Sequence, residues 1–300
     1  MRIDLPASLL GHDGRGAGWT GWLGALPRLV ASVLQEWQLV ADGPAAGGAE
    51  ALVLPVRDAD GGPAALKLGW PQPESAQEHL ALRAWDGAGA VRLLRADPRR
   101  RVLLLERAEP GEDLHTVEVL AACEIVAGLY GRLHRAPLPQ LDRLSVQAAR
   151  WAEELVTLRG TTLAPRRFVD QAIGLARELA TDPGTDVALL HTDLHFGNVL
   201  SARREPWLAI DPAPLAGDPA YEVAPLLWNR WAEALASGDL RNALLDRLHT
   251  VVDAAGLDED RVRDWVTVRE MVNVLWASQD PEPDRDWVTV CTTVTKAVQR

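Results

Sequence analysis

The sequence is poor in several residue types, and their scarcity limits what the protein can be. Its 300 residues include only two cysteines, Cys123 and Cys291, which are too few and too far apart for a disulfide framework or a cysteine-based metal site. No apolar run approaches the roughly eighteen residues that a membrane-spanning helix needs, and the first residues lack the apolar core of a signal peptide. We therefore expect a cytoplasmic protein that works without disulfides and without a membrane.

Lysine is as rare as cysteine. The 31 basic residues include only two lysines, Lys67 and Lys296. The lysine ammonium is a compact point charge that suits phosphate oxygens, and arginine does not simply replace it in that role. Lys67 alternates with Leu66 and Leu68, which is typical of a strand residue. Lys67 is therefore a candidate phosphate-binding residue.

The net charge of −11 is concentrated in residues 111–300, where 29 acidic residues face 19 basic ones. This balance disfavours nucleic acid as a partner, because phosphates demand the opposite sign. It would suit a cationic small molecule, and a solvated acidic surface that keeps the chain soluble is the alternative interpretation.

Hydrophobic patterning divides the chain into a small β-rich part and a larger helical part. Alternating apolar runs predict an antiparallel sheet of about five strands before residue 108, with a helix over 74–85. We expect a first domain over residues 1–108, in which residues 1–27 form a flexible or acceptor-side segment, and a helical second domain over 109–300. The helices predicted in the second domain cover 116–135, 144–158, 166–179, 218–235, 240–255, 259–277 and 287–298.

The most informative stretch runs from His191 through Asp193 and His195 to Asn198, and an Ile-Asp-Pro segment with Asp211 follows it. Short apolar runs precede both polar clusters, so each resembles a buried strand that ends in a carboxylate. One loop thus offers a candidate base and a neutral metal ligand, and a neighbouring strand end offers a charged ligand. Phosphoryl transfer from Mg·ATP in kinase-like enzymes needs these three roles.

The His-x-Asp-Leu-His-x-x-Asn and Ile-Asp-Pro motifs resemble those of the aminoglycoside phosphotransferases. Residues 66–85 and 209–229 are similar to the branch that contains streptomycin 6-phosphotransferases and hydroxyurea phosphotransferases, and the likeness covers roughly residues 35 to 235. The resemblance implies an α+β, two-lobed protein-kinase-like fold, with a small antiparallel β-rich N-lobe and a larger α-helical C-lobe. It also implies ATP and Mg²⁺ as cofactors.

The resemblance also implies roles for individual residues. Asp193 would be the catalytic residue that orients the acceptor hydroxyl, and Asn198 and Asp211 would bind Mg²⁺. Lys67 would bind the α- and β-phosphates of ATP and would be held by a glutamate of the following helix, for which Glu78 is favoured over Glu74.

The remaining candidates surround these groups. His191 would brace the catalytic loop. His195 would either contact a phosphate or support the residues that do, or it would have a purely structural role. Thr192 stands where the resembled family more often has glycine. Glu106 and Ala108 are candidate nucleotide-binding residues at the hinge, and the candidate acceptor-pocket residues are Asp218, Glu222, Trp228 and Trp231.

These residues predict an ATP-dependent kinase that phosphorylates a hydroxyl of a soluble small molecule, most simply the 6-hydroxyl of a streptomycin-type aminoglycoside. An amino-sugar (glucosamine) kinase and a hydroxyurea phosphotransferase share the same ATP machinery and stay open. A nucleotide-binding protein without activity is disfavoured because Lys67, Asp193, Asn198 and Asp211 are all present. A protein kinase is disfavoured because the six residues between Asp211 and Asp218 leave no space for an activation segment.

Overall fold

The computed structural model of the chain describes residues 4–11, 16–48, 50–71 and 74–299. It divides into two compact units, Met1–Pro110 with Ser201–Ile210 and Gly111–Leu200 with Asp211–Arg300. The expected α+β class is confirmed, because the strands pair in antiparallel sheets and most of the long helices lie in the second unit. The division at residue 108 lies close to the observed one, but the sequence pattern did not reveal that residues 201–210 belong to the first unit.

The first unit is built on an antiparallel sheet with the strand order β1-β3-β4-β6-β5, and β2 pairs with the other part of β3. The central strands β3, β4 and β6 carry the most continuous apolar runs, since both of their faces are covered. The strands are β1 (Val40–Ala41), β2 (Ala46–Gly47), β3 (Ala51–Arg57), β4 (Pro63–Gly69), β5 (Leu93–Asp97) and β6 (Val102–Glu106).

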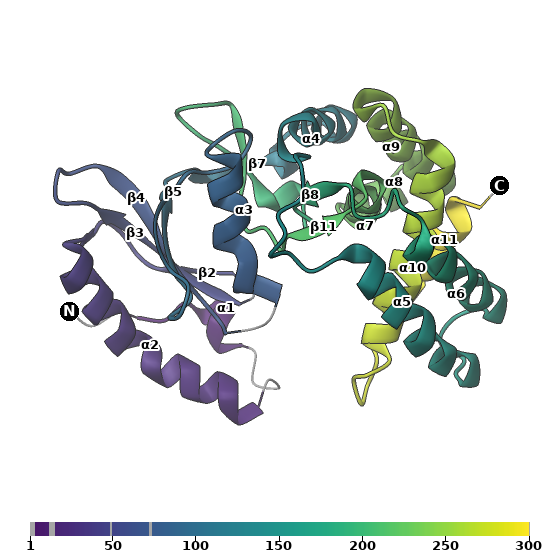
Figure 1. Ribbon diagram of the computed structural model, residues 1–300, viewed down its shortest axis with the longest axis horizontal. Coiled ribbons are helices and arrows are strands. Elements are labelled where there is room, and N and C mark those ends of the chain that lie inside the picture. The colour runs from purple at the N-terminus through teal and green to yellow at the C-terminus, as the bar shows by residue number, and fades with distance from the viewer. Residues whose placement is uncertain (1–3, 12–15, 49, 72–73, 300) are drawn as a thin grey trace. The chain divides into compact units, whose positions relative to one another are not determined.

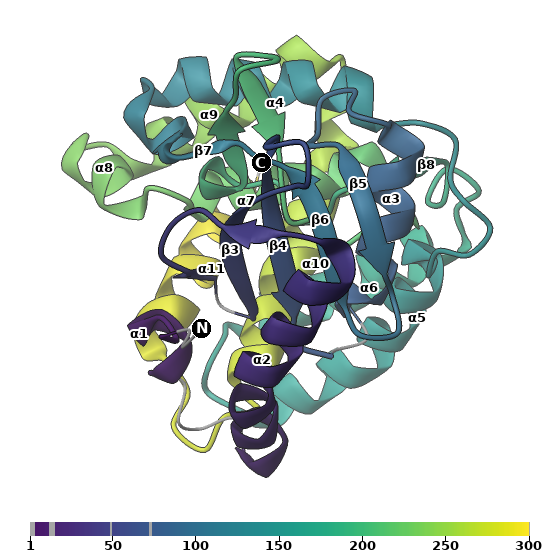
Figure 2. The same cartoon turned by 90° about the vertical axis from the view of Figure 1, so that its left-hand side faces the viewer.

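Helix α2 (Gly16–Trp37) covers one face of this sheet, as Figures 1 and 2 show. Trp19, Leu26 and Val30 of this helix are buried in a cluster that includes Leu52 and Leu66 of the strands. The flexible alternative for residues 1–27 is therefore wrong for the part that belongs to α2, and the acceptor-side alternative stays a prediction. The expectation arose because the glycines near residue 16 disguised the helical spacing of the apolar residues that follow.

The chain forms two short helices after β4. Residues Glu74–Gln77 form a 3₁₀ turn, and helix α3 (Glu78–Trp85) continues from it. Ala81, Leu82 and Trp85 bury the apolar face of α3, so Glu78 lies at the start of a fixed helix. The predicted helix over 74–85 is therefore confirmed in position, with its first turn in the 3₁₀ form.

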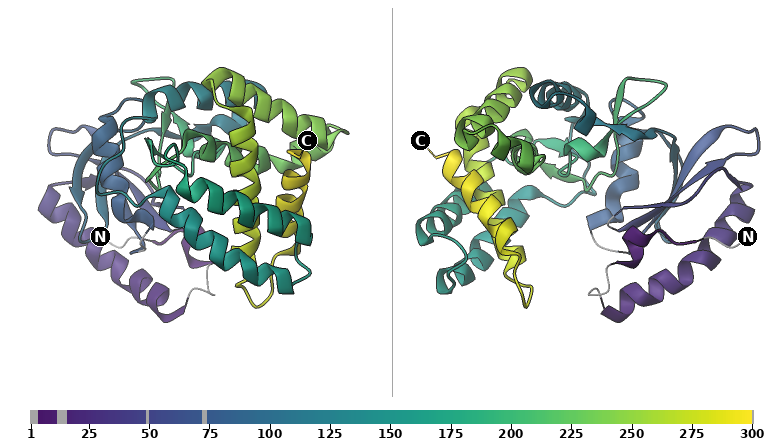
Figure 3. Two further views of the ribbon diagram at one scale, coloured as in Figure 1. Left: turned by 45° about the vertical axis from the view of Figure 1, so that its right-hand side comes forward. Right: turned by 180° about the vertical axis from the view of Figure 1, so that it is seen from behind.

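The second unit is mainly helical, as Figure 3 shows from two sides. Helix α10 lies at its centre and packs against α6 and α11, while α5 packs along α6 and α4 along α9. Apolar side chains surround α10 on almost every side, which is the pattern of a core helix. The long helices are α4 (Val119–Leu133), α5 (Leu144–Glu154), α6 (Arg166–Thr181), α9 (Leu240–Ala255), α10 (Glu259–Ala277) and α11 (Arg285–Ala297).

Short strands join these helices. β8 (Ala188–Leu190) pairs with β11 (Leu215–Gly217) in an antiparallel ladder. Three further short strands are β7 (Glu109–Asp113), β9 (Val199–Ser201) and β10 (Trp207–Ala209), of which β10 belongs to the first unit.

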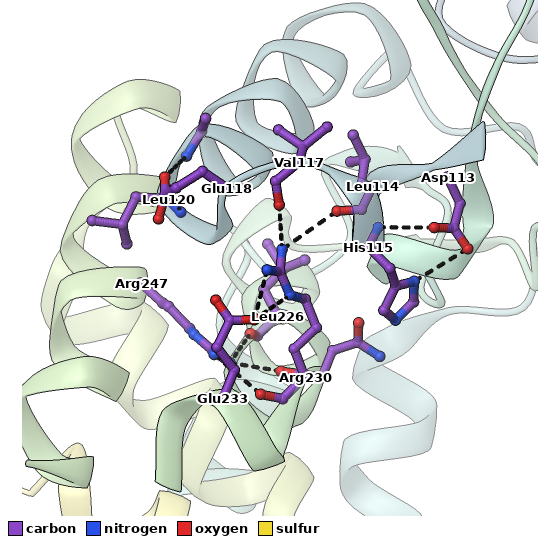
Figure 4. A network of polar contacts seen from close by, with 12 residues as sticks. Asp113, Leu114, His115, Val117, Glu118, Leu120, Leu226, Arg230, Glu233 and Arg247 are labelled. Atoms are coloured by element: carbon purple, nitrogen blue, oxygen red, sulfur yellow. Dashed lines mark hydrogen bonds and ion pairs between the residues drawn. The ribbon is translucent and has the colours of Figure 1, made fainter. Parts of the chain in front are cut away.

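The single helix predicted over 218–235 is wrong, because the chain is broken there into a 3₁₀ turn and two short helices, α7 (Ala224–Trp228) and α8 (Trp231–Ala236). Asn229 is extended and Arg230 adopts a left-handed conformation with φ 54°. The Arg230 guanidinium donates to the carbonyl of Val117 at 2.6 Å and to Glu233, which fixes the break (Figure 4). Hydrophobic periodicity could not show this break, because the bond from Arg230 to Val117 reaches 113 residues back along the chain.

Two further observations concern apolar surface. Trp85, Trp151 and Trp265 are buried, whereas Trp276 is 45% exposed. None of the helices in the described part of the chain is long and apolar enough to cross a membrane.

Helix α10 also buries an acidic side chain. Glu270 has no exposed surface, and neither carboxyl oxygen has a hydrogen-bond partner among the described residues. Burial raises the pKa of Glu270 to about 8, since a carboxylate is poorly solvated in such a place.

We predict that Glu270→Gln changes the pH dependence of stability. The native state holds this proton to higher pH than the unfolded chain, so the wild type loses stability as pH rises from about 4.5 through about 8. The amide variant lacks this loss and should be more stable than the wild type at pH 8 but not at pH 5. Urea unfolding across this pH range measures the difference, with Glu124→Gln on an exposed helix face as the control. Parallel curves for Glu270→Gln and the wild type would show that Glu270 titrates normally.

Candidate active site

The candidate catalytic loop follows strand β8 and ends in the 3₁₀ turn Phe196–Asn198. The Asn198 amide Nδ2 donates to the backbone carbonyl of Asp193 at 2.8 Å and to its carboxylate at 3.1 Å. Asn198 is buried, whereas the Asp193 side chain is 48% exposed. The structure therefore brings these two predicted residues together, with the Asp193 carboxylate open to a substrate.

His191 links this loop to the segment that carries Asp211. It is fully buried, and its Nδ1 accepts a hydrogen bond from the backbone N–H of Asp193 at 3.3 Å. The carbonyl of His191 accepts from the N–H of Ala213 at 3.0 Å. Asp193 and Asp211 each lie two residues from this backbone bond, so the ladder of β8 and β11 holds their segments side by side.

Thr192 adopts a left-handed conformation with φ 62°. A β-branched residue is disfavoured there by about 1–2 kcal/mol, which explains why glycine suits this position in the resembled family. The local bonds offset this cost, because the Thr192 hydroxyl donates to the carbonyl of Ala213 and the Thr192 N–H donates to the carboxylate of Glu222. The residue before Asp193 is thus fixed on both sides.

Glu222 is the carboxylate that anchors the loop. It is fully buried, and its second oxygen lies 2.6 Å from Nε2 of His134, which stacks on Tyr130. Burial by itself would raise the pKa of Glu222. The hydrogen bond and charge of His134, the charge of His191 and the N–H of Thr192 outweigh burial and hold this pKa below its usual range.

The structure corrects the assignment of Asp218 and Glu222 to the acceptor pocket. Asp218 is 4% exposed, and its carboxylate accepts bonds from Arg261, from Nε1 of Trp265 at 2.6 Å and from a backbone N–H. Both carboxylates are committed to internal partners, so neither is available to an acceptor. The sequence showed only that they were acidic and near the motif.

The two tryptophans proposed for the acceptor pocket flank the break between α7 and α8. Trp228 packs edge to face against Trp287 at 5.7 Å, and both Trp228 and Trp231 are half-buried. Their placement is compatible with a partly open apolar surface, and an acceptor contact stays a prediction.

His195 has a local structural bond. Its Nδ1 accepts from the N–H of Gly197 at 3.1 Å, which caps the 3₁₀ turn, and its Nε2 lies 3.9 Å from the Asp193 carboxylate. The side chain is 31% exposed. The capping bond supports the structural alternative. Because Nε2 lies near the Asp193 carboxylate, a phosphate-contacting role stays a prediction.

The first unit holds the predicted ion pair of Lys67 and Glu78. The Lys67 ammonium donates to both carboxylate oxygens of Glu78, at 2.7 and 2.8 Å. Lys67 is 6% exposed and Glu78 is 4% exposed, so both charges depend on their partners for solvation. Lys67 lies in β4 between Val53 and Leu103, which fixes the direction of its side chain.

The carboxylate of the hinge candidate Glu106 is bound by an arginine. Arg204 donates to both of its carboxylate oxygens at 2.9 Å, and the N–H of Arg92 donates to one of them. Burial raises the pKa of Glu106, but Arg204 and Arg92 lower this pKa by a larger amount, so the net shift is downward. The Glu106 side chain therefore serves the fold of the first unit, and a nucleotide contact at the hinge would have to use backbone groups near Ala108.

The donor set at the catalytic loop fits magnesium. Asn198 turns its Nδ2 toward Asp193, so its amide oxygen faces the other way, and Asp211 would supply a carboxylate. Magnesium prefers such oxygen donors and uses few protein ligands alongside substrate phosphates. The described residues contain no cluster of three or more His, Cys, Asp or Glu that could hold a metal ion.

Sequence reasoning missed two residues that hold the catalytic loop. His134 binds Glu222, and Arg269 donates from Nη2 to the carbonyl of Thr192 at 2.7 Å. The signal for Arg269 was present, because Arg269 and Glu270 interrupt an otherwise apolar run in α10. His134 has no comparable signal, since an isolated histidine at a helix end is common.

The architecture is that of the protein-kinase-like fold. The fold resembles the crystal structure of the aminoglycoside phosphotransferase APH(4)-Ia with a TM-score of 0.59, at 17% identity over 90% of this chain and 98% of that one. A choline/ethanolamine kinase family protein from Mesorhizobium loti gives a TM-score of 0.58, at 17% identity over 90% of this chain and 94% of that one. These likenesses establish the architecture.

Residues 36–281 match the family described as aminoglycoside/hydroxyurea antibiotic resistance kinase, and the chain belongs to this family. It is 40% identical to streptomycin 6-kinase of Streptomyces glaucescens over 93% of this chain and 92% of that protein. It is 41% identical to hydroxyurea phosphotransferase of Kitasatospora aureofaciens over 95% of this chain and 84% of that protein. The resemblance seen in the motifs is thereby confirmed.

We predict that Glu222→Gln destabilises the protein by about 2 kcal/mol at neutral pH, because charge-assisted bonds to Thr192 and His134 are weakened. The lowered native pKa stabilises the fold above the ordinary value of 4.5, and this contribution is lost as pH falls through the native pKa. The variant should therefore lose less stability than the wild type between pH 5 and strongly acidic pH. Urea unfolding at several pH values measures this, with the exposed Glu153→Gln as the control. Equal stability of Glu222→Gln and the wild type at pH 7 would contradict the anchoring role.

Proposed function

We propose that the protein is an ATP- and Mg²⁺-dependent kinase that transfers the γ-phosphoryl group of ATP to a hydroxyl of an aminoglycoside, with the 6-hydroxyl of streptomycin as the first candidate. The observation that carries this proposal is the braced loop that presents Asp193 beside Asn198, in a chain about 40% identical to a streptomycin 6-kinase over most of its length. Because the reaction consumes ATP, we place it in the cytoplasm.

The Asp193 carboxylate would accept a hydrogen bond from the acceptor hydroxyl and direct that oxygen at the γ-phosphorus. Its side chain is exposed enough to meet a substrate, while Asn198 and the bonds at Thr192 fix its direction. In phosphoryl transfer, positioning and charge neutralisation supply most of the rate enhancement. Asn198 and Asp211 would hold the Mg²⁺ that neutralises the phosphate oxygens.

Lys67 would bind the phosphates of ATP as a point charge. The bidentate contact with Glu78 fixes the ammonium in one place, from which its charge would attract a phosphate oxygen. The acceptor is proposed to be a small polar molecule, and the acidic balance of residues 111–300 favours a cation.

A hydroxyurea phosphotransferase is the second candidate, because that relative is as similar to the chain as the streptomycin kinase. A glucosamine kinase is the third and rests on the shared ATP machinery alone. The acceptors differ strongly in size and charge, so a direct assay separates them.

We predict Mg²⁺-dependent ATP consumption with streptomycin, and no comparable rate with hydroxyurea, glucosamine, kanamycin or choline. Mass spectrometry and ³¹P NMR of the product identify the phosphorylated hydroxyl. Asp193→Asn should lower kcat roughly a thousandfold and leave ATP binding nearly unchanged, since positioning of the acceptor is lost. Asp170→Asn, at a surface ion pair with Arg159, is the control and should keep full turnover. Full turnover by Asp193→Asn would refute the catalytic assignment, and turnover confined to hydroxyurea would move the protein to the second candidate.

We also predict that Lys67→Met and the double variant Lys67→Met/Glu78→Gln separate binding from stability. The single variant leaves the Glu78 carboxylate buried without its cation and should lose about 3 kcal/mol of unfolding free energy. The double variant should recover most of this stability, but both should lose at least tenfold in kcat/KM for ATP because the phosphates lack their cation. Thermal unfolding and steady-state kinetics measure the two effects. Recovery of activity together with stability would show that the pair is only structural.

A further inference from the structure

The strongest unexplained feature outside the predicted residues is the buried arginine of α10. Arg269 is 8% exposed, and its guanidinium lies 4.5 Å from the ring centre of Tyr221 and 5.6 Å from that of Trp228. Nη2 donates to the carbonyl of Thr192. An arginine of the core helix therefore reaches the residue that precedes Asp193.

Stability does not explain this arginine. Within the described part of the chain, Nε and Nη1 of Arg269 have no hydrogen-bond partner. Each buried donor without a partner costs about 1–3 kcal/mol, and an apolar side chain of similar volume would avoid that cost. The rings of Tyr221 and Trp228 compensate in part through their negative faces. What the arginine alone provides is the bond to the carbonyl of Thr192.

That carbonyl belongs to the peptide unit that joins Thr192 to Asp193. A peptide unit is planar, so its oxygen and its N–H move together. Arg269 holds the oxygen end at 2.7 Å, and Nδ1 of His191 accepts from the N–H end at 3.3 Å. Two side chains from different elements thus fix the plane from which the Asp193 side chain departs.

The conformation of Thr192 explains why this peptide unit needs to be held by side chains. Its positive φ is unfavourable for a β-branched residue, so the isolated loop would prefer another backbone geometry. Glu222 holds the peptide unit before Thr192, and Arg269 holds the one after it. Without Arg269 only the 3.3 Å bond to His191 holds the second peptide unit, and any rotation of this unit moves the carboxylate of Asp193.

We propose that Arg269 is a positioning residue for phosphoryl transfer, which fixes the Thr192–Asp193 peptide unit and through it the direction of the Asp193 carboxylate. The proposal rests on the function proposed above. Arg269 touches neither substrate nor nucleotide, so its loss should lower kcat and leave the KM for ATP unchanged.

The test uses Arg269→Met, Arg269→Lys and Arg269→Ala in the full chain. Arg263→Met is the matched control, because Arg263 lies in the same helix and also donates to a backbone carbonyl, that of Val298 at 2.8 Å. Hydrogen–deuterium exchange of the peptide that spans residues 190–200 reports on the loop without any acceptor. Steady-state kinetics with the acceptor identified above report on the reaction.

Arg269→Met should speed exchange in residues 190–200 and lower kcat on the order of 10- to 100-fold, with the KM for ATP within about twofold of the wild type. Arg263→Met should change neither. Millimolar guanidinium chloride should restore part of kcat in Arg269→Ala, because the free ion can occupy the place between the rings, whereas sodium chloride at equal ionic strength should not. Arg269→Lys keeps the charge but loses the planar fork, so it should fall between the methionine variant and the wild type.

Unchanged exchange in residues 190–200 of a folded Arg269→Met protein would overturn the proposal, whichever acceptor the enzyme uses. Faster exchange with an unchanged kcat would also overturn it, because the loop would then not need this bond for the reaction. If Arg269→Met does not fold, Arg269→Lys decides by the same two readouts. Absence of turnover by the wild type on every acceptor would instead refute the proposed function, while the exchange data would still decide whether Arg269 orders the loop.

Discussion

The second unit depends on one buried carboxylate. Glu222 joins a helix end, a core turn and the catalytic loop, because its two oxygens bind His134 and the N–H of Thr192. The OH of Tyr130 also donates to the backbone carbonyl of Glu222. A charge without solvent must be fully bonded to be tolerated, so the groups around it have little freedom to move. The geometry of the loop is thus set by the requirement to satisfy this charge.

The architecture was readable from the sequence where local pattern and tertiary packing agree. The strands on either side of Lys67 and the helix that begins with Glu78 follow from alternation and helical spacing. Prediction failed where long-range bonds override the pattern. Arg230 interrupts an apolar helical run because it binds carbonyls more than a hundred residues away, and residues 201–210 join the first unit through Arg204.

The chemical groups of the candidate site were predictable because the reaction restricts residue type and spacing. Asp193 and Asn198 lie together as their motif implies, and Lys67 pairs with Glu78. The supporting residues were not predictable in the same way. A carboxylate such as Asp218 looks the same in the sequence whether it faces a ligand or a buried arginine, and only the fold distinguishes the two. Charged residues within the apolar run of a core helix were the one signal that could have identified Arg269.

The scarcity of lysine has a chemical consequence once the structure is known. Of the two lysine amines, the one on Lys296 is exposed and the one on Lys67 is buried against Glu78. A reagent selective for amines would therefore modify Lys296 readily. The rate of its reaction at Lys67 would measure how often the buried ion pair opens. The reaction at Lys296 thus serves as an internal standard for the reactivity of the reagent, and the reaction at Lys67 reports on the opening of the protein.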